Sequence, residues 1–147
     1  MPPDSIHTKR KSSIFGVVSV NGETLLEGRR CLVLDDEFLI AMDIQQILEK
    51  AGAHHVACAA SAAEAAELLR REPWFDVAVL DVKLSGPEGD SLGVAALLTE
   101  KKTPFVFLTG MRIDDVHAKR FPNAPVIEKP YDAITLLGAV RRALASP

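Results

Sequence analysis

The chain lacks several features that would assign it to a common class of protein. Its 147 residues hold only two cysteines, too few for a disulfide scaffold, and neither Cys31 nor Cys58 has the histidine or cysteine spacing of a zinc site. No apolar run approaches the roughly 18 residues of a membrane helix, and the polar N-terminus has no signal-peptide core. Nucleotide-binding glycine loops are missing after the expected strands. We therefore expect a globular, cytoplasmic protein with reduced thiols.

A strong charge of one sign is also missing. The formal net charge is −3, and residues 1–30 hold five basic and three acidic residues, so the rest of the chain carries −5. Proteins that bind DNA usually present a basic face, and a mildly acidic body offers none. We expect no direct nucleic-acid binding. The basic run at 9–11 is typical of a solvated tail, with contact to an acidic partner as the alternative.

From residue 30 onward, short apolar runs alternate with amphipathic stretches. Five alternations predict a parallel sheet with helices on both faces, because such strands are buried on both sides. The default for this size is an α/β fold of the (βα)5 flavodoxin-like, doubly wound type, with strand order 2-1-3-4-5. Strands are expected at 31–34, 55–58, 76–81, 105–108 and 125–128. Helices are expected at 38–51, 61–71, 90–101 and 114–120, and from a cap at Asp132 toward the end of the chain.

Residues 1–29 stand apart from this pattern. The runs 14–20 and 23–26 flank Asn21-Gly22, which is the pattern of a hairpin with a type I′ turn. A lone two-stranded hairpin is marginally stable in water, so it should dock on this domain or on a partner. A linker or the remnant of an upstream region is the alternative. We divide the chain into an extension, 1–29, and a domain, 30–147.

Chemically active side chains follow four of the five predicted strands. Asp35 and Asp36 follow the first, Asp81 ends the third, Thr109 follows the fourth and Lys129 follows the fifth. The carboxyl ends of parallel strands share one edge of the sheet, where such folds form their sites. Each residue alone is typical of a cap or a turn. The occurrence of all of them together, at the carboxyl ends of four strands, favours a functional site.

The charges in this set restrict its chemistry. Two carboxylates about 4 Å apart repel by about 4 kcal/mol at an effective dielectric constant near 20. A divalent cation relieves that repulsion, and Mg²⁺ accepts one or two carboxylates together with water and phosphate oxygens. Lys129 adds a second positive charge and the Thr109 hydroxyl a donor. The set suits a phosphoryl group, with a carboxylate attacking phosphorus.

Four motifs carry a family resemblance. LVLDDE, VAVLDVKL, FVFLTG and VIEKP, in this order and spacing, resemble the signatures of the receiver domain of bacterial two-component response regulators. The resemblance covers residues 30–145. It implies a phosphoprotein that takes a phosphoryl group from a histidine kinase or a histidine phosphotransfer protein and then switches a surface for a downstream protein target. It implies no membrane contact and no turnover of an external substrate. The oligomeric state, including a homodimer, stays open.

The resemblance also implies roles for individual residues. Asp81 is the expected phosphoacceptor, and Thr109 and Lys129 are expected to contact the phosphoryl group and couple it to the switch. A cis peptide bond is expected before Pro130. The expected Mg²⁺ ligands are Asp35, Asp36, Asp81 and the backbone carbonyl of Lys83.

The fifth strand departs from the family pattern. Receivers usually carry a tyrosine or phenylalanine a few residues before the lysine, where this chain has Val126. The FVFLTG run is similar to the Phe-x-Thr-Gly variant receivers, which also lack that aromatic, and the whole stretch is similar to receivers attached to sensor histidine kinases. We expect the signal to pass through the backbone of 109–111 to a surface formed by 114–120, the fifth strand and the last helix.

Two other functions compete with phosphoacceptance. One is a phosphorylation-independent, receiver-like interaction module, which the missing aromatic favours. The other is a phosphatase with an aspartyl nucleophile, which needs a second aspartate two residues later as its general acid. Lys83 occupies that position, which argues against the phosphatase.

Overall fold

Nine helices and strands form the described part of the protein. The computed structural model describes residues 24–84, 91–110 and 119–145. No helix within these ranges is long and apolar enough to cross a membrane. The elements are β1 (Arg30–Leu34), α2 (Phe38–Lys50), β2 (His55–Ala59), α3 (Ala62–Arg71), β3 (Val77–Asp81), α4 (Leu92–Glu100), β4 (Phe105–Thr109), β5 (Val126–Glu128) and α6 (Ala133–Ala145).

The five strands form one parallel sheet in the order β2-β1-β3-β4-β5, which confirms the predicted flavodoxin-like topology. The register places Leu34 of β1 beside Leu80 of β3, and Asp81 beside Leu108 of β4. The first residue after β1 therefore lies close to the last residue of β3. The order also makes β1, β3, β4 and β5 successive neighbours, so the ends that carry the predicted site lie together.

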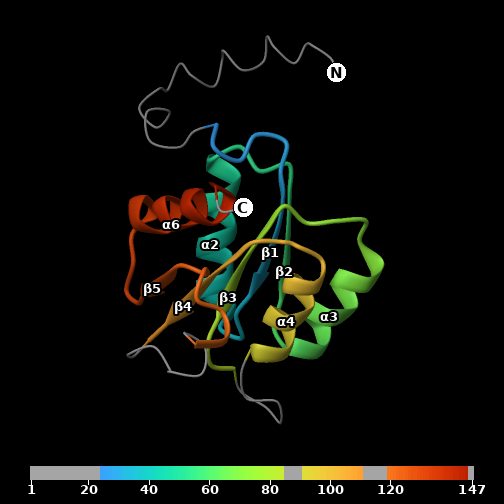
Figure 1. Ribbon diagram of the computed structural model, residues 1–147. Coiled ribbons are helices and arrows are strands. Elements are labelled where there is room, and N and C mark those ends of the chain that lie inside the picture. Colours follow the sequence, from blue (N-terminus) through green and yellow to red (C-terminus); the bar gives the residue numbers. More distant parts are fainter. Residues whose placement is uncertain (1–23, 85–90, 111–118, 146–147) are drawn as a thin grey trace.

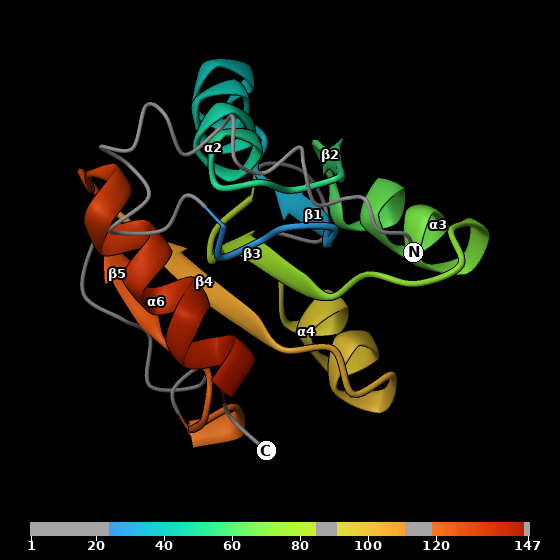
Figure 2. The same cartoon turned by 90° about the horizontal axis from the view of Figure 1, so that it is seen from above.

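Two helical layers enclose the sheet (Figures 1 and 2). One apolar cluster joins alternate residues of β1, β3 and β4 to α2 and α6, and the other joins the intervening residues to α3 and α4. The central strands β3 and β4 are buried along their whole length. Burial on both faces explains why their sequences are almost continuously apolar.

Local sequence signals set the helix starts. The Ser61 hydroxyl accepts the Glu64 N–H at 3.1 Å, and the Glu64 carboxylate accepts the Ala60 N–H at 2.8 Å, so the predicted capping of this helix is confirmed. Asp132 accepts the Thr135 N–H at 2.8 Å and caps α6, as predicted. The two cysteines are free thiols.

The predicted hairpin is wrong where the structure describes it. Residues 24–28 form turns, and the other half, 14–23, lies outside the described residues. Leu26 is fully buried in the α2–α6 cluster, and its N–H donates to the Ala51 carbonyl at 3.0 Å. Leu26 buries more apolar surface in this cluster than it would in an isolated two-stranded hairpin, and burial of apolar surface stabilises the turn conformation. The division at residue 30 stays a prediction, but the packed core begins upstream of it.

The predicted helix at 114–120 lies mostly outside the described residues, and only 119 and 120 are seen as helical. The structure gives α4 a start at Leu92, with residue 90, the predicted start, outside the described ranges.

Candidate functional site

Three carboxylates gather at the carboxyl ends of β1 and β3. Ligand oxygens of Asp35, Asp36 and Asp81 all lie within 4.8 Å of one another. Asp35 is 2% exposed and Asp81 6% exposed, whereas Asp36 is half-buried. The strands hold Asp35 and Asp81 in place because the residues before them, Leu34 and Leu80, are register partners. The predicted acidic cluster is therefore present, with one member open to solvent.

Lys129 brings a positive charge into this cluster from the end of β5. Its Nζ lies 3.4 Å from Asp81 Oδ1, 3.5 Å from Asp35 Oδ2 and 4.0 Å from Glu37 Oε1. Its backbone N–H donates to the Thr109 carbonyl at 2.7 Å, and the Lys129–Pro130 peptide bond is cis, as predicted. The amine thus bridges two buried carboxylates that come from different strands.

The two buried carboxylates, Asp35 and Asp81, share the single ammonium group of Lys129. Burial and, next, the Asp35 charge raise the pKa of Asp81 to about 6, although Lys129 acts in the opposite direction. Burial also raises the pKa of Asp35, despite the Glu37 N–H that its carboxylate accepts at 2.9 Å. Burial lowers the pKa of Lys129, but Asp81 and Asp35 together raise it above its ordinary value. The cluster holds excess negative charge, which suits a divalent cation.

Thr109 lies beside this cluster on β4. It is 4% exposed, pairs in register with Glu128 of β5, and follows Leu108, the partner of Asp81. The register sets Thr109 one step beyond the level of Asp81, on the neighbouring strand. A threonine side chain carries a hydroxyl that can donate a hydrogen bond.

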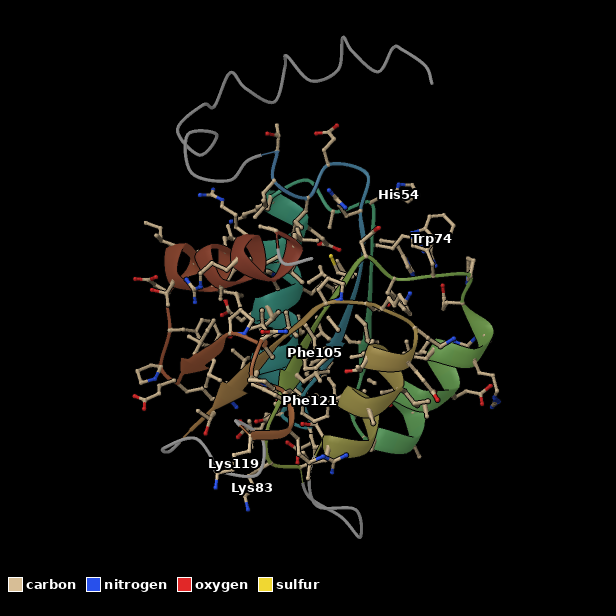
Figure 3. The ribbon with its side chains drawn as sticks, viewed as in Figure 1. His54, Trp74, Lys83, Phe105, Lys119 and Phe121 are labelled. Atoms are coloured by element: carbon tan, nitrogen blue, oxygen red, sulfur yellow. The ribbon has the colours of Figure 1, made fainter. Side chains whose placement is uncertain are left out.

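Lys83 does not join the cluster through its side chain. It lies two residues beyond β3 and is exposed, and Figure 3 shows it at the end of the molecule where the strands terminate. The predicted use of its backbone carbonyl as a metal ligand stays a prediction.

Tyr131, two residues after Lys129, was not among the residues predicted from the sequence. Tyr131 is half-buried against the α2–α6 cluster, and the Asp43 carboxylate of α2 lies close enough to influence its ionisation. Burial and, next, the Asp43 and Asp35 charges raise the pKa of Tyr131 to about 12. The Lys-Pro-Tyr run was the available signal, but the pairing with α2 depends on the fold. Val126, at the usual aromatic position, is 36% exposed.

Sequence relatives include proteins longer than this chain. A protein-glutamate methylesterase/protein-glutamine glutaminase of Archaeoglobus fulgidus is 34% identical over 121 residues, covering 78% of this chain and 34% of that protein. The transcriptional regulatory protein PdtaR of Mycobacterium tuberculosis is 31% identical, covering 80% of this chain and 57% of that protein. The chain thus spans between a third and somewhat over half of the length of these relatives.

Solved structures agree with the sequence matches. A response regulator receiver protein of Sinorhizobium medicae superposes with a TM-score of 0.73 at 28% identity, covering 82% of this chain and 98% of that one. SdrG of Pseudomonas melonis, in its BeF3-activated conformation, gives a TM-score of 0.65 at 34% identity, covering 79% and 96%. The family model of the response regulator receiver domain matches residues 31–141, so this chain belongs to that family.

Proposed function

We propose that this receiver domain accepts a phosphoryl group on Asp81. The observation that carries the proposal is the buried Asp81 carboxylate, which lies 3.4 Å from the Lys129 amine and within 4.8 Å of two further aspartates. A structural carboxylate would be expected to have its charge matched, whereas this one lies in a cluster with excess negative charge. Such an arrangement fits a carboxylate that is converted into an acyl phosphate.

The chemistry is a transfer between two protein side chains. An Asp81 carboxylate oxygen forms a bond to phosphorus while the bond between phosphorus and the donor histidine nitrogen breaks, and the imidazole leaves. With its pKa near 6, Asp81 is mostly ionised at neutral pH and can act as the nucleophile. Lys129 would offset charge on the phosphoryl oxygens, and Thr109, which lies on the next strand, would donate to one of them.

Mg²⁺ is the proposed cofactor, and the residues present fit it. Asp35, Asp36 and Asp81 supply oxygen ligands within 4.8 Å of one another, and the half-buried Asp36 leaves a path to solvent. The Lys83 carbonyl is the proposed fourth protein ligand. When bound, the ion supplies positive charge to the phosphoryl oxygens.

The proposed donor is a histidine kinase or a histidine phosphotransfer protein, in the cytoplasm of a bacterium. Support comes from α2, whose first turn follows the acidic cluster directly. Phe38 and Leu39 are 72% and 77% exposed, and Met42 one turn later is also exposed. Apolar side chains exposed beside a reactive site favour protein docking.

The output is proposed to be a shift between two pre-existing conformations. The acyl phosphate adds about −1.5 to −2 charge at pH 7, which would draw Thr109 and Lys129 inward. Because Val126 replaces the aromatic, we propose that the backbone of 109–110 carries the change onward; Met111, also implicated by the sequence, lies outside the described residues. The receiving surface would include β5 and α6 and would contact a downstream protein or a second copy.

The test is phosphoryl transfer from phosphoramidate, whose P–N bond resembles that of phosphohistidine, to the full chain. Intact-mass spectrometry should show one added phosphoryl group, lost in Asp81→Asn and in the presence of EDTA. Asp76→Asn is a matched control, because Asp76 lies just before β3 and Asp81 ends it. Lys129→Ala should keep some labelling and lose the conformational response.

Equal labelling of Asp81→Asn and the wild type would refute the proposal. If neither is labelled but a downstream protein still binds, the phosphorylation-independent interaction module replaces it.

A further inference from the structure

A cavity lies at the opposite end of the sheet from the acidic cluster. It has a volume of about 550 Å³ and is lined by residues from the end of α4, the start of β4, the segment before β5 and the last turns of α6. Phe105 begins the strand that Thr109 ends, so the cavity and the acidic cluster lie at opposite ends of β4. We call it the amino-end pocket.

The apolar surface of the amino-end pocket is aromatic. The rings of Phe105 and Phe121 meet edge to face at 5.6 Å, and Figure 3 shows both side chains directed toward one another. Phe105 is almost fully buried, whereas Phe121 is half-buried and packs against the α3–α4 cluster. Ala124 and Pro104 extend this surface. A flat apolar body can therefore lie against two rings that are already fixed by packing.

The charges that line the pocket are of one sign. Lys102 and Arg120 both line it, and none of its described lining residues is acidic. Among residues 24–84, 91–110 and 119–145, no ion pair involves either cation. The Arg120 guanidinium lies over the Phe121 ring, 5.5 Å from its centre, so its charge is held against the aromatic surface.

Lys102 adopts a conformation that normally favours glycine. Its φ is 59°, and it follows the last turn of α4 in a Schellman arrangement: the Thr103 N–H donates to the Leu98 carbonyl at 2.8 Å and the Lys102 N–H to the Thr99 carbonyl at 3.0 Å. A side chain at this position strains the backbone, so helix termination alone does not account for a lysine. The strained residue contributes its cation to the pocket.

We propose that the amino-end pocket binds a small organic anion with an aromatic or aliphatic body. The body would lie on Phe105 and Phe121, and the anionic group, a carboxylate, sulfonate or phosphate, would face Lys102 and Arg120. The volume lies in the range of cavities that hold small molecules, roughly 300–1,000 Å³. Apolar walls with a few convergent charges are the common composition of such sites. The proposal does not depend on phosphorylation of Asp81.

The probe is 1-anilinonaphthalene-8-sulfonate, an aromatic sulfonate that fluoresces in apolar surroundings. Titrated into the full chain, it should bind saturably, and the neutral N-phenyl-1-naphthylamine should bind more weakly. The double variant Lys102→Gln/Arg120→Gln should weaken sulfonate binding by roughly tenfold. The control Lys101→Gln/Lys119→Gln removes the same charge from exposed neighbours that do not line the pocket, and it should bind like the wild type.

Amide chemical shifts locate the bound probe independently of the variants. Shifts centred on Thr103, Phe105 and Ala124 are expected, and Asp81→Asn should give the same shifts, which separates this site from the phosphoacceptor proposal. Equal weakening in both double variants, or shifts centred elsewhere, would overturn the assignment. Binding of an acidic peptide without binding of the sulfonate would overturn the small-molecule class.

Discussion

The two ends of β3 both carry charged clusters, but only one of them is balanced. At the amino end, Asp76 accepts the Arg30 N–H at 2.8 Å and lies 3.9 Å from Arg29, and the Arg30 guanidinium pairs with Glu72. Arg30 also donates to the Trp74 carbonyl at 2.8 Å and stacks on its ring at 5.1 Å. Two guanidinium groups thus meet two carboxylates.

At the carboxyl end, the two buried carboxylates of Asp35 and Asp81 share one amine, and the pKa of Asp81 is raised to about 6. This difference in charge balance distinguishes a structural cluster at one end of β3 from a proposed functional cluster at the other. In a matched cluster each charge has a partner, so removal of one member destabilises the fold by leaving the other unpaired. A cluster with excess negative charge lowers the stability of the free protein, and we propose that a cation and a phosphoryl group complete it. Charge balance therefore distinguishes the two ends of the strand more clearly than the number of charged residues does.

The largest expected effect comes from neutralising the unmatched end. Asp81→Asn should raise the free energy of unfolding at pH 7.5, without Mg²⁺, by on the order of 2–3 kcal/mol. An acid with a raised folded-state pKa binds more protons when folded, so the wild type loses stability as pH rises from about 4 to 6, and the full loss is present above that range. Urea unfolding at pH 4 and 7.5 measures this. A variant that is stabilised equally at both pH values would contradict the account.

Removing charge at the matched end should have the opposite sign. Arg30→Met keeps much of the side-chain volume but leaves Glu72 without its guanidinium and the Trp74 carbonyl without its donor. We expect a loss of about 2 kcal/mol in the free energy of unfolding, measured by urea titration. Arg70→Met, which removes an exposed pair with Glu67, should cost well under 1 kcal/mol. Equal costs for both variants would remove the distinction between the two ends.

The third prediction concerns the exposed apolar face of α2 beside the carboxyl-end cluster. Leu39→Asp should slow phosphoryl transfer from a protein donor by roughly tenfold, because it puts a charge into the proposed docking face. Transfer from phosphoramidate should be unchanged. Ile134→Asp is the control, since Ile134 is 66% exposed but belongs to α6. Quench-flow assays measure the rate of transfer. If both substitutions slow phosphoryl transfer from the protein donor equally, the assignment of α2 as the docking face is wrong.

The smallest effect concerns the strained residue at the amino-end pocket. Lys102→Gly should raise the free energy of unfolding by about 1 kcal/mol, because glycine adopts a φ of 59° without steric cost. Lys101→Gly is the control: at φ −86° it should lower stability slightly, since glycine there only adds freedom to the unfolded chain. Thermal unfolding of the two variants compares them. A loss of stability in Lys102→Gly would show that the lysine itself holds the helix end.

Much of the fold could be predicted because local and global signals agree. Continuous apolar runs such as the one before Asp81 mark strands buried on both faces, and Ser61 and Asp132 mark helix starts through their own side chains. The acidic cluster was predictable for a further reason: parallel strands bring their carboxyl ends together whatever the details of packing.

The remaining features depend on contacts between distant segments. Leu26 resembles a strand residue in the sequence, but the end of α2 provides both a hydrogen-bond acceptor and an apolar layer for it. The packing of Tyr131 against the α2–α6 cluster, near Asp43, requires α2 and the segment before α6 to lie side by side. The amino-end pocket is lined by four separate segments, and no local pattern predicts its shape.

The most direct measurement identifies the residue that carries the phosphoryl group. Borohydride reduces an acyl phosphate to an alcohol, so treatment of the phosphorylated chain should convert an aspartyl phosphate into homoserine. Peptide sequencing by mass spectrometry should find homoserine at position 81 alone, and none after phosphorylation is attempted with EDTA present. Homoserine at position 35 or 36 instead, or a stable phosphoryl group that resists reduction, would contradict the assignment of Asp81 as the acceptor.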